Sequence, residues 1–516
     1  MLKSIRWYWN NEPLTLAISL GMLFRLLAVI FSKGYGMIDD HFLVIESSQS
    51  WVDGEDYNNW LPSSGNDEPK GHSFFYPGIH YLLFRLLESF GFNDPQGKMY
   101  FIRLFHAAFS LLTIYFGYKI TRQLGNMKIA RQAAFLMALL WFMPFLSVRN
   151  MVEIVCIPFL LWGVWIIVHA ENKKSLLPYL ISGIILGIAF SIRFQTILFA
   201  GGTGLALLLR KQWKQSLILG AGYIFSVFAT QGIIDILIWG YPFAELSEYV
   251  NHNIIHKTDY IVSPWYNYIL LILGILIPPV SLFLLVGFFR VWRKHMIIFL
   301  PTFVFLAFHS YFPNKQERFI LPVLPFFIIA GLLGWYSYVN RSGFWRRNRK
   351  LLHGCWIFFW SVNLMLLPVI STTYSKKALV ESMTYLSDYS GEKFLLLENS
   401  TRYGVPMVPR YYLDGWPGYI EIDKSRKISD LDSAFITNRD IIPRFILFFE
   451  EKDMKQRVAQ VRSVYPEISH ETTIEPGFID KVMHWLNPVN ANQTIVIYRN
   501  NDVLPPSPSN ATGKSP

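Results

Sequence analysis

The chain has 516 residues and a mean hydropathy of +0.29, with 52% hydrophobic and only 16% charged residues. This balance excludes a soluble enzyme and predicts a polytopic membrane protein. The formal net charge is +11, but the positive-inside rule accounts for much of that excess, so it does not indicate a nucleic-acid partner.

Apolar runs long enough to cross a bilayer, about twenty residues each, recur down to about residue 372. Basic residues occur in every second loop between them, which predicts a cytoplasmic N-terminus. The run Phe74 to Phe90 contains Arg85 and Glu88 and is expected to be an interfacial helix. The sequence thus predicts about eleven spans, near 14–32, 99–121, 130–148, 151–170, 176–192, 195–209, 216–239, 265–289, 296–312, 319–339 and 351–372.

The segment YGMIDDHFLVIESSQS, from Tyr35 to Ser50, follows the first span directly. It places Asp39 and Asp40 side by side just beyond the bilayer, and Glu46 a little further on. Two adjacent carboxylates repel each other, so one holds its proton more tightly than a free Asp would. Such a group suits proton abstraction from a sugar hydroxyl. The alternative is an Asx-type turn or a helix cap at the end of a span.

Further charged residues fall on the same predicted side of the membrane, although they are far apart in sequence. Each of them alone is typical of a snorkelling or helix-capping residue. Together they predict one polar cavity at the outer membrane surface. They include Glu153, Arg193, Asp235, Lys315, Glu317 and Arg318.

The composition changes at about Ser375. KFLLLEN, FILFFE and TIVIYRN have the pattern of short buried strands, and EKDMKQRVAQVRSVYP that of an amphipathic helix. We therefore predict a membrane domain over 1–374, with its first extracytoplasmic loop at 33–98. An extracytoplasmic α/β domain is predicted over 375–500 and a disordered tail over 501–516.

Several ordered blocks in residues 14 to 340 resemble a known family. The blocks are IDDHF (38–42), Trp60, HSFFYP with His72 and Tyr76-Pro77, Asn150 with Glu153, Arg193, Asp235 with Gly240, Pro264-Trp265 with Tyr268, and NKQERF (314–319). With these blocks in this order, the chain resembles the polytopic mannosyltransferases that use polyprenyl-phosphate-linked mannose. These are the GPI-anchor and N-glycan α-mannosyltransferases of the C-type glycosyltransferase superfold. The chain departs from the family pattern at three positions, with His72 for Arg, Asn314 for His and Gln316 for Glu.

The resemblance implies an inverting transfer from a polyprenyl- or dolichyl-phosphate sugar to a glycan or glycolipid acceptor, with no metal or other cofactor. Asp39 is the expected base, with Asp40 as its close alternative. Cations placed where charge develops stabilise a departing phosphate, and the candidates are Lys315, Arg318, Arg193 and His72. The candidates for sugar binding are Glu46, Tyr76, Glu153, Asp235, Trp265, Tyr268 and Glu317. For the aromatic members of this set, a place in the interfacial belt is an equal alternative.

Other functions remain open at this stage. A transporter or flippase of a lipid-linked sugar would also have many spans, although it would favour charges near the bilayer midplane and inverted repeats. A transferase of another sugar or an inactive scaffold are further alternatives. The α/β appendage favours a bacterial inner membrane, and the endoplasmic reticulum is the alternative in a eukaryote. The triplets at Asn399, Asn492 and Asn510 fit N-glycosylation signals.

Overall fold

The computed structural model of the chain describes residues 2–63, 68–171, 173–389, 394–431, 441–488 and 493–503. It divides into two compact units. The first comprises Met1–Ser32, Gly36–Phe92 and Lys98–Thr372, and the second comprises Lys33–Tyr35, Asn93–Gly97 and Thr373–Pro516. The predicted N-glycosylation triplets at Asn492 and Asn510 and the tail from 504 onward lie outside the described residues.

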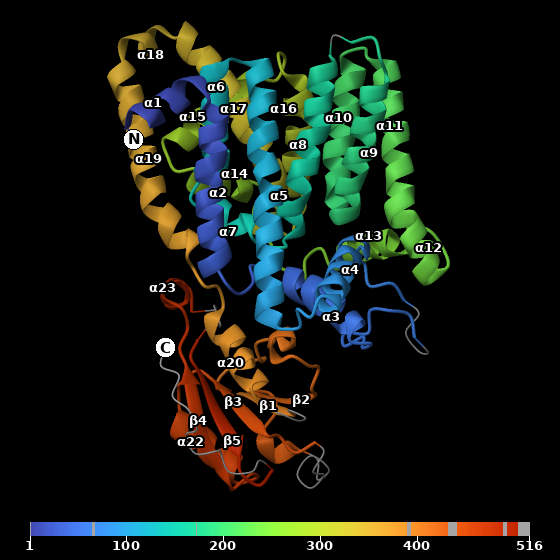
Figure 1. Cartoon of the computed structure of the whole chain (residues 1–516), viewed down its shortest axis with the longest axis vertical. Helices are drawn as coiled ribbons and strands as arrows, with labels where there is room; N and C mark the ends of the chain where they lie inside the picture. The colour runs from blue at the N-terminus through green and yellow to red at the C-terminus, as the bar shows by residue number, and fades with distance from the viewer. Residues whose placement is uncertain are drawn as a thin grey trace. The chain divides into compact units, whose positions relative to one another are not determined.

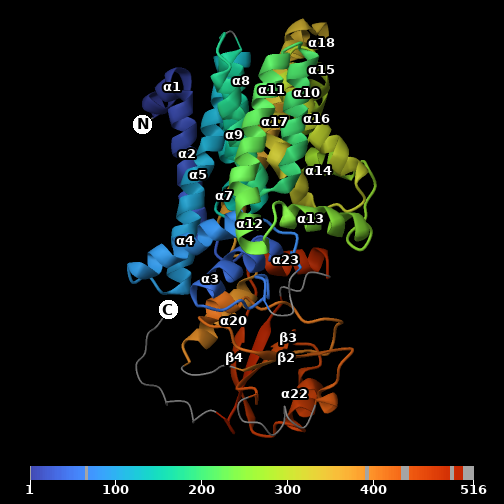
Figure 2. The ribbon, with the colours of Figure 1, turned by 90° about the vertical axis from the view of Figure 1, so that its right-hand side faces the viewer.

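The first unit is a bundle of helices (Figures 1 and 2). Its helices are α1 (Leu2–Asn11), α2 (Pro13–Phe31), α3 (Ser47–Val52), α4 (Phe75–Ser89), α5 (Pro95–Leu124), α6 (Met127–Leu139), α7 (Met143–Ser147), α8 (Val152–Ala170), α9 (Leu177–Ile192), α10 (Ile197–Leu209), α11 (Trp213–Val227), α12 (Ile233–Trp239), α13 (Ala244–Ile255), α14 (Asn267–Ile275), α15 (Val280–Arg290), α16 (Met296–Tyr311), α17 (Leu324–Arg341), α18 (Gly343–Arg347) and α19 (Arg349–Ser371). Irregular helical turns join them at η1 (Asp40–Glu46), η2 (Phe194–Thr196), η3 (Phe228–Gly232) and η4 (Glu317–Val323).

Six helical segments are long and apolar enough to cross a membrane, which confirms the polytopic helical fold. They are Pro13–Phe31, Pro95–Leu124, Val152–Ala170, Trp213–Trp239, Glu317–Arg341 and Arg349–Ser371. Four shorter apolar helices accompany them, at Leu177–Ile192, Phe194–Leu209, Val280–Arg290 and Met296–Tyr311. Every predicted run coincides with a helix or with a pair of helices, but the number of membrane crossings stays a prediction.

Two of the predicted runs are broken in the structure. In the run 130–148 the helix ends at Leu139. Near this end the side chain of Arg25 donates hydrogen bonds to the carbonyls of Met137 and Ala138. Asn363 donates to the carbonyl of Leu139 and accepts from the amide of Trp141. These two side chains satisfy backbone groups that a continuous helix would have paired. The run 265–289 breaks at Pro278-Pro279 because proline lacks the amide proton that a helix needs.

Small residues allow close helix packing within the bundle. Helices α9 and α11 lie side by side (Figure 1), and a Cβ added at Gly183 would meet the carbonyl oxygen of Leu219 at 2.1 Å. Gly222 approaches the backbone of Leu180 in the same way. Such contacts are typical of membrane helices, where backbones pack through small residues because lipid supplies no hydrophobic drive for association.

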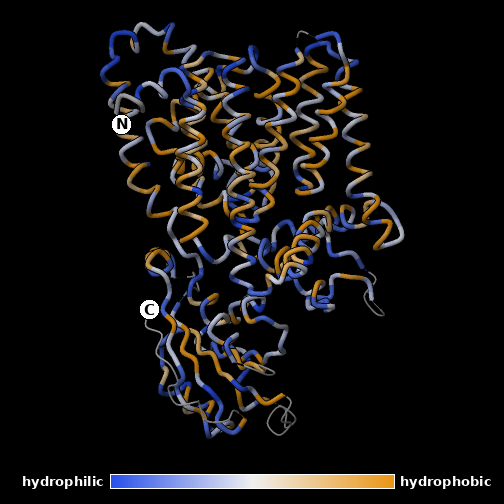
Figure 3. The backbone as a smooth tube through the Cα atoms, in the orientation of Figure 1, coloured by the Kyte–Doolittle hydropathy of each residue, from blue (hydrophilic) through white to orange (hydrophobic). Residues whose placement is uncertain are grey.

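The two ends of the bundle differ in structure and charge. Helices α1 and α18 lie at one end, whereas α3, α4, α12 and α13 gather at the other (Figure 1). The middle of the bundle is predominantly apolar, and hydrophilic residues collect toward its ends (Figure 3). The basic segment 341–350 lies at the α18 end, as the loop-charge pattern requires if that end is cytoplasmic.

The second unit contains a five-stranded mixed sheet in the order β2-β1-β3-β5-β4. Its strands are β1 (Leu395–Asn399), β2 (Tyr419–Asp423), β3 (Phe445–Phe449), β4 (Ile468–Ile474) and β5 (Ile495–Asn500). Its helices are α20 (Lys377–Ser387), α22 (Met454–Arg462) and α23 (Phe478–Leu486), with short turns η5 (Arg410–Leu413) and η6 (Ile428–Asp430).

The α/β architecture of this unit agrees with the sequence prediction. The three predicted strands are β1, β3 and β5, and the predicted amphipathic helix is α22. Strands β2 and β4 were missed, because β2 alternates between exposed and buried residues over only five positions and β4 has a single buried residue. Of the predicted glycosylation sites, Asn399 is buried and its side chain donates to the carbonyl of Gly404, so it is not accessible for modification in this fold.

Candidate active site

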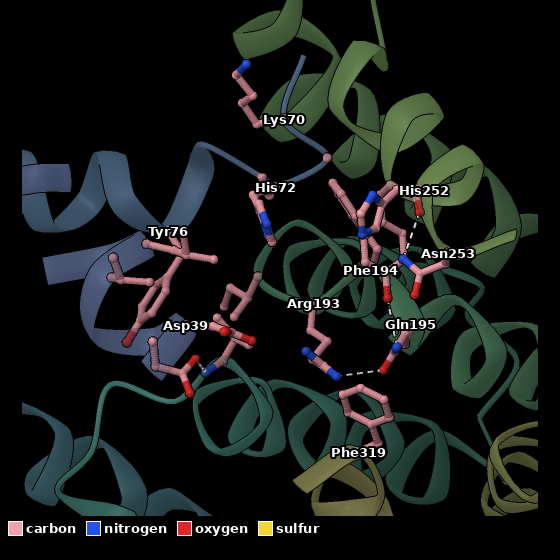
Figure 4. Close-up of a pocket in the computed structure, with 18 of the residues that line it drawn as sticks. Asp39, Lys70, His72, Tyr76, Arg193, Phe194, Gln195, His252, Asn253 and Phe319 are labelled. Atoms are coloured by element: carbon pink, nitrogen blue, oxygen red, sulfur yellow. Dashed lines mark hydrogen bonds between the residues drawn. The ribbon is translucent and has the colours of Figure 1, made fainter. Parts of the chain in front are cut away.

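A polar cavity of about 340 Å³ lies in the first unit and brings together Asp39, Asp40, His72, Arg193 and Arg318 from the residues singled out by the sequence. Figure 4 shows Asp39, His72, Tyr76 and Arg193 arranged around it. Its walls come from several segments of the chain, between residues 39 and 319. The lining residues used below are Asp39, Asp40, Trp60, Lys70, His72, Tyr76, Arg193, Gln195, Tyr249, His252, Gln316 and Arg318.

The two aspartates stand at the start of η1, a wide π-helical turn. Asn150 donates from its side chain to the backbone carbonyl of Asp40, and the amide of Val152 approaches the Asp40 carboxylate at 3.4 Å. The side chain of Asp39 is 50% exposed, whereas that of Asp40 is almost fully buried. Asp39 is therefore the carboxylate that a ligand in the cavity reaches.

Two arginines and three carboxylates form a connected charge cluster beside the cavity. Arg318, in η4, forms ion pairs with Asp39 and with Asp40, the latter at 3.3 Å. Glu153, at the start of α8, is fully buried and lies 3.0 Å from Arg193 and 3.4 Å from Arg318. A buried carboxylate between two cations fixes their positions, because each charge compensates the desolvation of the others.

Arg193 has capacity for a further partner. Its guanidinium contacts Glu153 and donates to Gln195 at 2.8 Å, and Gln195 in turn donates to Tyr249. Its Nε is buried and has no hydrogen-bond partner among the described residues. An anion in the cavity would supply one, and arginine matches phosphate geometry well.

Asp40 has an unusual protonation equilibrium for a carboxylate. Burial raises the pKa of Asp40 to about 8, with the negative charges of Glu153 and Asp39 adding to the effect and Arg318 opposing it. At neutral pH Asp40 is therefore mostly neutral, which relieves the repulsion that Asp39 would otherwise meet. The repelling pair expected from the sequence is present, and the buried member is the one that retains its proton.

Tyr76 lines the cavity, and its buried hydroxyl is held in a fixed orientation by His106. Its hydroxyl lies 2.6 Å from Nε2 of His106, whose Nδ1 lies 2.7 Å from the carbonyl of Ile102. A carbonyl only accepts, so Nδ1 carries the proton, and the tyrosine hydroxyl donates a hydrogen bond to Nε2 of neutral His106. This bond fixes the direction of the Tyr76 ring, which forms part of the cavity wall. Burial raises the pKa of Tyr76, which keeps its proton in place.

Tyr76→Phe is expected to lower turnover about tenfold, because the ring in the cavity wall loses the bond that orients it, and to reduce stability by about 1–2 kcal/mol because His106 loses a buried partner. Steady-state kinetics and thermal melting measure the two effects. Tyr118→Phe is the matched control, since Tyr118 contacts Met127 and does not line the cavity. Equal activity losses in both variants would contradict the assignment.

The loop that carries His72 is held by acidic residues on α12 and α13. Glu245 accepts from the amide of His72 at 3.0 Å, and Asp235 accepts from the amide of Glu245 at 3.3 Å. Gly71 has a φ of +72°, and its Cα approaches Tyr249 so closely that a Cβ would lie 3.1 Å from that backbone. The His72 ring stacks on Trp60 with 5.3 Å between centroids. Asp235 thus positions the cavity wall instead of lining it.

Several predicted site residues lie outside this cavity. Glu46 is buried and faces His41 at 3.4 Å, and Glu317 is exposed to solvent. Lys315 donates to the carbonyls of His309 and Phe312 at the end of α16 and does not line the cavity. The sequence pattern Lys-x-x-Arg indicated two phosphate ligands, but η4 places only Arg318 in position.

Trp265 and Tyr268 line a separate, apolar cavity of about 400 Å³. Apart from Ser310, its other walls are aliphatic and aromatic side chains of α14, α15, α16 and α17. The Tyr268 hydroxyl donates to the carbonyl of Gln316 at 3.1 Å, and Gln316 also lines the polar cavity. The segment that precedes Arg318 therefore lies next to both cavities.

Lys70 and His252 are lining residues that the sequence reasoning missed. The available signal for Lys70 was its place beside Gly71 and His72 in a loop already assigned to the outer face. His252 offered only the spacing of an amphipathic helix. Among the described residues, no group of three or more His, Cys, Asp or Glu side chains is arranged to hold a metal ion.

This fold and this site define a multi-pass membrane protein of the C-type glycosyltransferase superfold. The structure of ArnT from Cupriavidus metallidurans bound to undecaprenyl phosphate matches 95% of this chain and 99% of that chain with a TM-score of 0.63 at 12% identity, and so shares the fold. The chain belongs to the Alg9-like mannosyltransferase family, whose profile matches residues 16–400. The predicted family and superfold are confirmed.

Three named relatives show how far the similarity extends. The chain is 29% identical over 153 residues to a probable Dol-P-Man:Man(7)GlcNAc(2)-PP-Dol alpha-1,6-mannosyltransferase of Schizosaccharomyces pombe, covering 29% of this chain and 28% of that protein. It is 24% identical to GPI alpha-1,2-mannosyltransferase 3 of Danio rerio over 60% of this chain and 57% of that one. With Mannosyltransferase APTG1 of Arabidopsis thaliana it shares 22% identity over 87% of each. The first two matches span less than two thirds of those relatives.

Proposed function

We propose that this protein is an inverting membrane glycosyltransferase that moves a mannosyl residue from a polyprenyl- or dolichyl-phosphate sugar to a hydroxyl of a glycan or glycolipid. The observation that carries the proposal is the charge cluster in which Asp39 and Arg318 meet Arg193 at one cavity. Family membership and the mannosyltransferase names of the relatives support mannose as the sugar.

The proposed reaction is a single displacement at the anomeric carbon. Asp39 takes the proton of the acceptor hydroxyl as its oxygen forms a bond to that carbon. The bond from the carbon to the phosphate oxygen breaks, and its electron pair leaves with the lipid phosphate. Arg318 and Arg193 stabilise the charge that develops there. The lipid phosphate leaves readily once its charge is stabilised, so no second acid is needed.

The apolar cavity supports a lipid-linked donor. It lies beside the segment that carries Gln316, and its lining is almost wholly aliphatic and aromatic. A polyprenyl chain would bury apolar surface there at about 25 cal/mol per Å². The phosphate would then lie toward Arg318 and the sugar toward Asp39. This arrangement uses Trp265 and Tyr268 to hold lipid instead of sugar.

A transporter or flippase is the second candidate, and the position of the charges disfavours it. The charge cluster lies at the end of the bundle where α3, α4, α12 and α13 gather. Arg25, which is buried within α2, bonds to Ser110 and to backbone carbonyls and has no carboxylate partner among its hydrogen bonds. Together with the loop charges, these positions favour an active site on the extracytoplasmic face. The bacterial inner membrane stays the predicted location.

The test is donor turnover by purified protein in lipid vesicles. With labelled polyprenyl-phosphate-mannose and a membrane glycolipid extract as acceptor, we expect release of polyprenyl phosphate and label in the acceptor. The same lipid carrying glucose should react at least tenfold more slowly, and EDTA should have no effect. Movement of intact donor between leaflets without cleavage would instead establish the transporter.

Activity is expected to fall as pH rises through about 8. Asp40 loses its proton in that range, and the added negative charge opposes binding of an anionic donor next to Arg318. The Michaelis constant for donor should therefore rise above pH 8, and Asp40→Asn should remove that rise. If the rate instead increased as pH rises through 8, and this increase were absent in Asp40→Asn, Asp40 would be the base.

A further inference from the structure

The second unit contains a cavity of its own, with a volume of about 470 Å³. Its lining comes from the segments that follow β1, β2 and β3, and from the adjoining face of α22. This volume lies within the range of small-molecule sites, about 300–1,000 Å³. The lining residues used below are Glu398, Ser400, Thr401, Asp423, Lys424, Arg426, Lys427, Ser429, Lys452, Asp453, Gln456, Arg457 and Gln460.

The topology of the sheet explains why a cavity forms here. Strand β1 pairs in parallel with β2 on one side and with β3 on the other. The chain thus leaves β1 toward one neighbour and later returns on its opposite side. Where a parallel sheet reverses its winding in this way, the loops at the carboxyl ends separate and leave a ligand crevice. Thr401, Lys424 and Lys452 follow those three strand ends.

The charge that faces this cavity is predominantly positive. Four basic residues of the lining are exposed, namely Lys424, Arg426, Lys427 and Lys452. Of the carboxylates, Asp423 already accepts from the amides of Gly404 and Ser425, at 2.7 and 2.8 Å. Glu398 is paired with Arg457, so Asp423 and Asp453 oppose the four cations and the balance stays positive. A ligand of negative charge fits this balance.

The floor of the cavity is rigid and contains an unsatisfied polar atom. Arg457 is buried and donates to Glu398 at 2.6 Å and to the carbonyls of Phe449, Glu450 and Lys452. These bonds tie the ends of β1 and β3 to α22. The hydroxyl oxygen of Thr401 is buried there, and no described residue gives it a hydrogen bond. Buried polar atoms are normally paired, so this one points to a partner supplied by a ligand.

We propose that this cavity binds a phosphate-bearing saccharide, with the phosphate held by Arg426 and Lys452 and the sugar hydroxyls by Gln456, Gln460, Ser429 and Thr401. Arginine and lysine are the usual partners of phosphate, and amide and hydroxyl side chains supply the mixed donors and acceptors that sugar hydroxyls require. The site is independent of the proposed transfer reaction, because all its residues belong to the second unit.

The test is a calorimetric titration of the full-length protein in detergent with mannose 6-phosphate, inorganic phosphate and mannose. We expect saturable binding of mannose 6-phosphate, weaker binding of inorganic phosphate and none of mannose. The double variant Arg426→Gln/Lys452→Gln should weaken binding of mannose 6-phosphate by about tenfold or more, since it removes two charge-assisted hydrogen bonds. Gln456→Glu should weaken it similarly by repulsion. Both variants change exposed side chains, so thermal melting should not shift.

Lys455→Gln is the matched control, because Lys455 is exposed on the same helix and does not line the cavity. Three results would overturn the proposal. The first is that neither phosphate probe shows saturable binding up to about 10 mM. The second is an equal loss of binding in Lys455→Gln and in the double variant. The third is binding that disappears in Arg193→Gln but persists in the double variant. The last result would place the ligand in the membrane unit.

Discussion

Asp39→Asn is expected to lower the transfer rate by about 10³-fold while leaving expression and melting temperature close to those of the wild type. A positioned general base contributes about 10²–10⁴-fold to a rate, and the amide has no comparable affinity for a proton. The Asp39 side chain is half exposed, so the change buries no new polar group. Donor turnover in vesicles and thermal melting are the two measurements.

Glu317→Gln is the control for this variant. It makes the same chemical change next to Arg318, but the Glu317 side chain is exposed and does not line the cavity. Its rate should stay within about twofold of wild type, as expected for a surface substitution. If Asp39→Asn kept substantial activity and Asp40→Asn lost it, the base would be the buried carboxylate. Full activity in both Asp39→Asn and Asp40→Asn would contradict the proposed mechanism.

Arg318→Gln is expected to abolish transfer and to destabilise the fold by about 3 kcal/mol, because breaking a buried ion-pair network leaves charges uncompensated. Asp39 and Glu153 lose their shared cation, and the mostly neutral Asp40 loses a contact at 3.3 Å. Since the variant combines two effects, Arg318→Lys separates them. Lysine keeps the charge and most of the stability, but it lacks the planar fork that contacts several oxygens at once. Its turnover should fall about tenfold to a hundredfold.

Lys315→Gln tests the other half of the Lys-x-x-Arg pattern. In the structure the Lys315 ammonium caps carbonyls at the end of α16 instead of facing the polar cavity. We therefore expect turnover near the wild-type level and a loss of stability of about 1 kcal/mol from the lost hydrogen bonds. A Lys315→Gln variant as inactive as Arg318→Gln would show that the lysine reaches the donor phosphate during turnover.

Much of the fold followed from patterns that operate over short distances. Apolar runs of about twenty residues located the helices, because bilayer thickness sets their length. The helix breaks at Leu139 and at Pro278-Pro279 differ in whether the sequence reveals them. The proline pair is visible in the sequence, whereas the break at Leu139 depends on Arg25 and Asn363, which approach from distant helices. Strands β2 and β4 were missed, because five alternating residues in β2 and a single buried residue in β4 give weak signals.

The sequence by itself determined the membrane class, the family blocks and the importance of the Asp39-Asp40 pair, since these depend on composition and on neighbouring residues. Only the tertiary structure decided which charges meet. Arg318 and Lys315 are three positions apart, yet the irregular turn η4 directs one to the cavity and leaves the other on backbone carbonyls. Lys70 and His252 joined the site because a loop and a helix far apart in the chain pack together. Packing over long sequence separations sets side-chain direction, burial and charge pairing, and local pattern contains no information on any of the three.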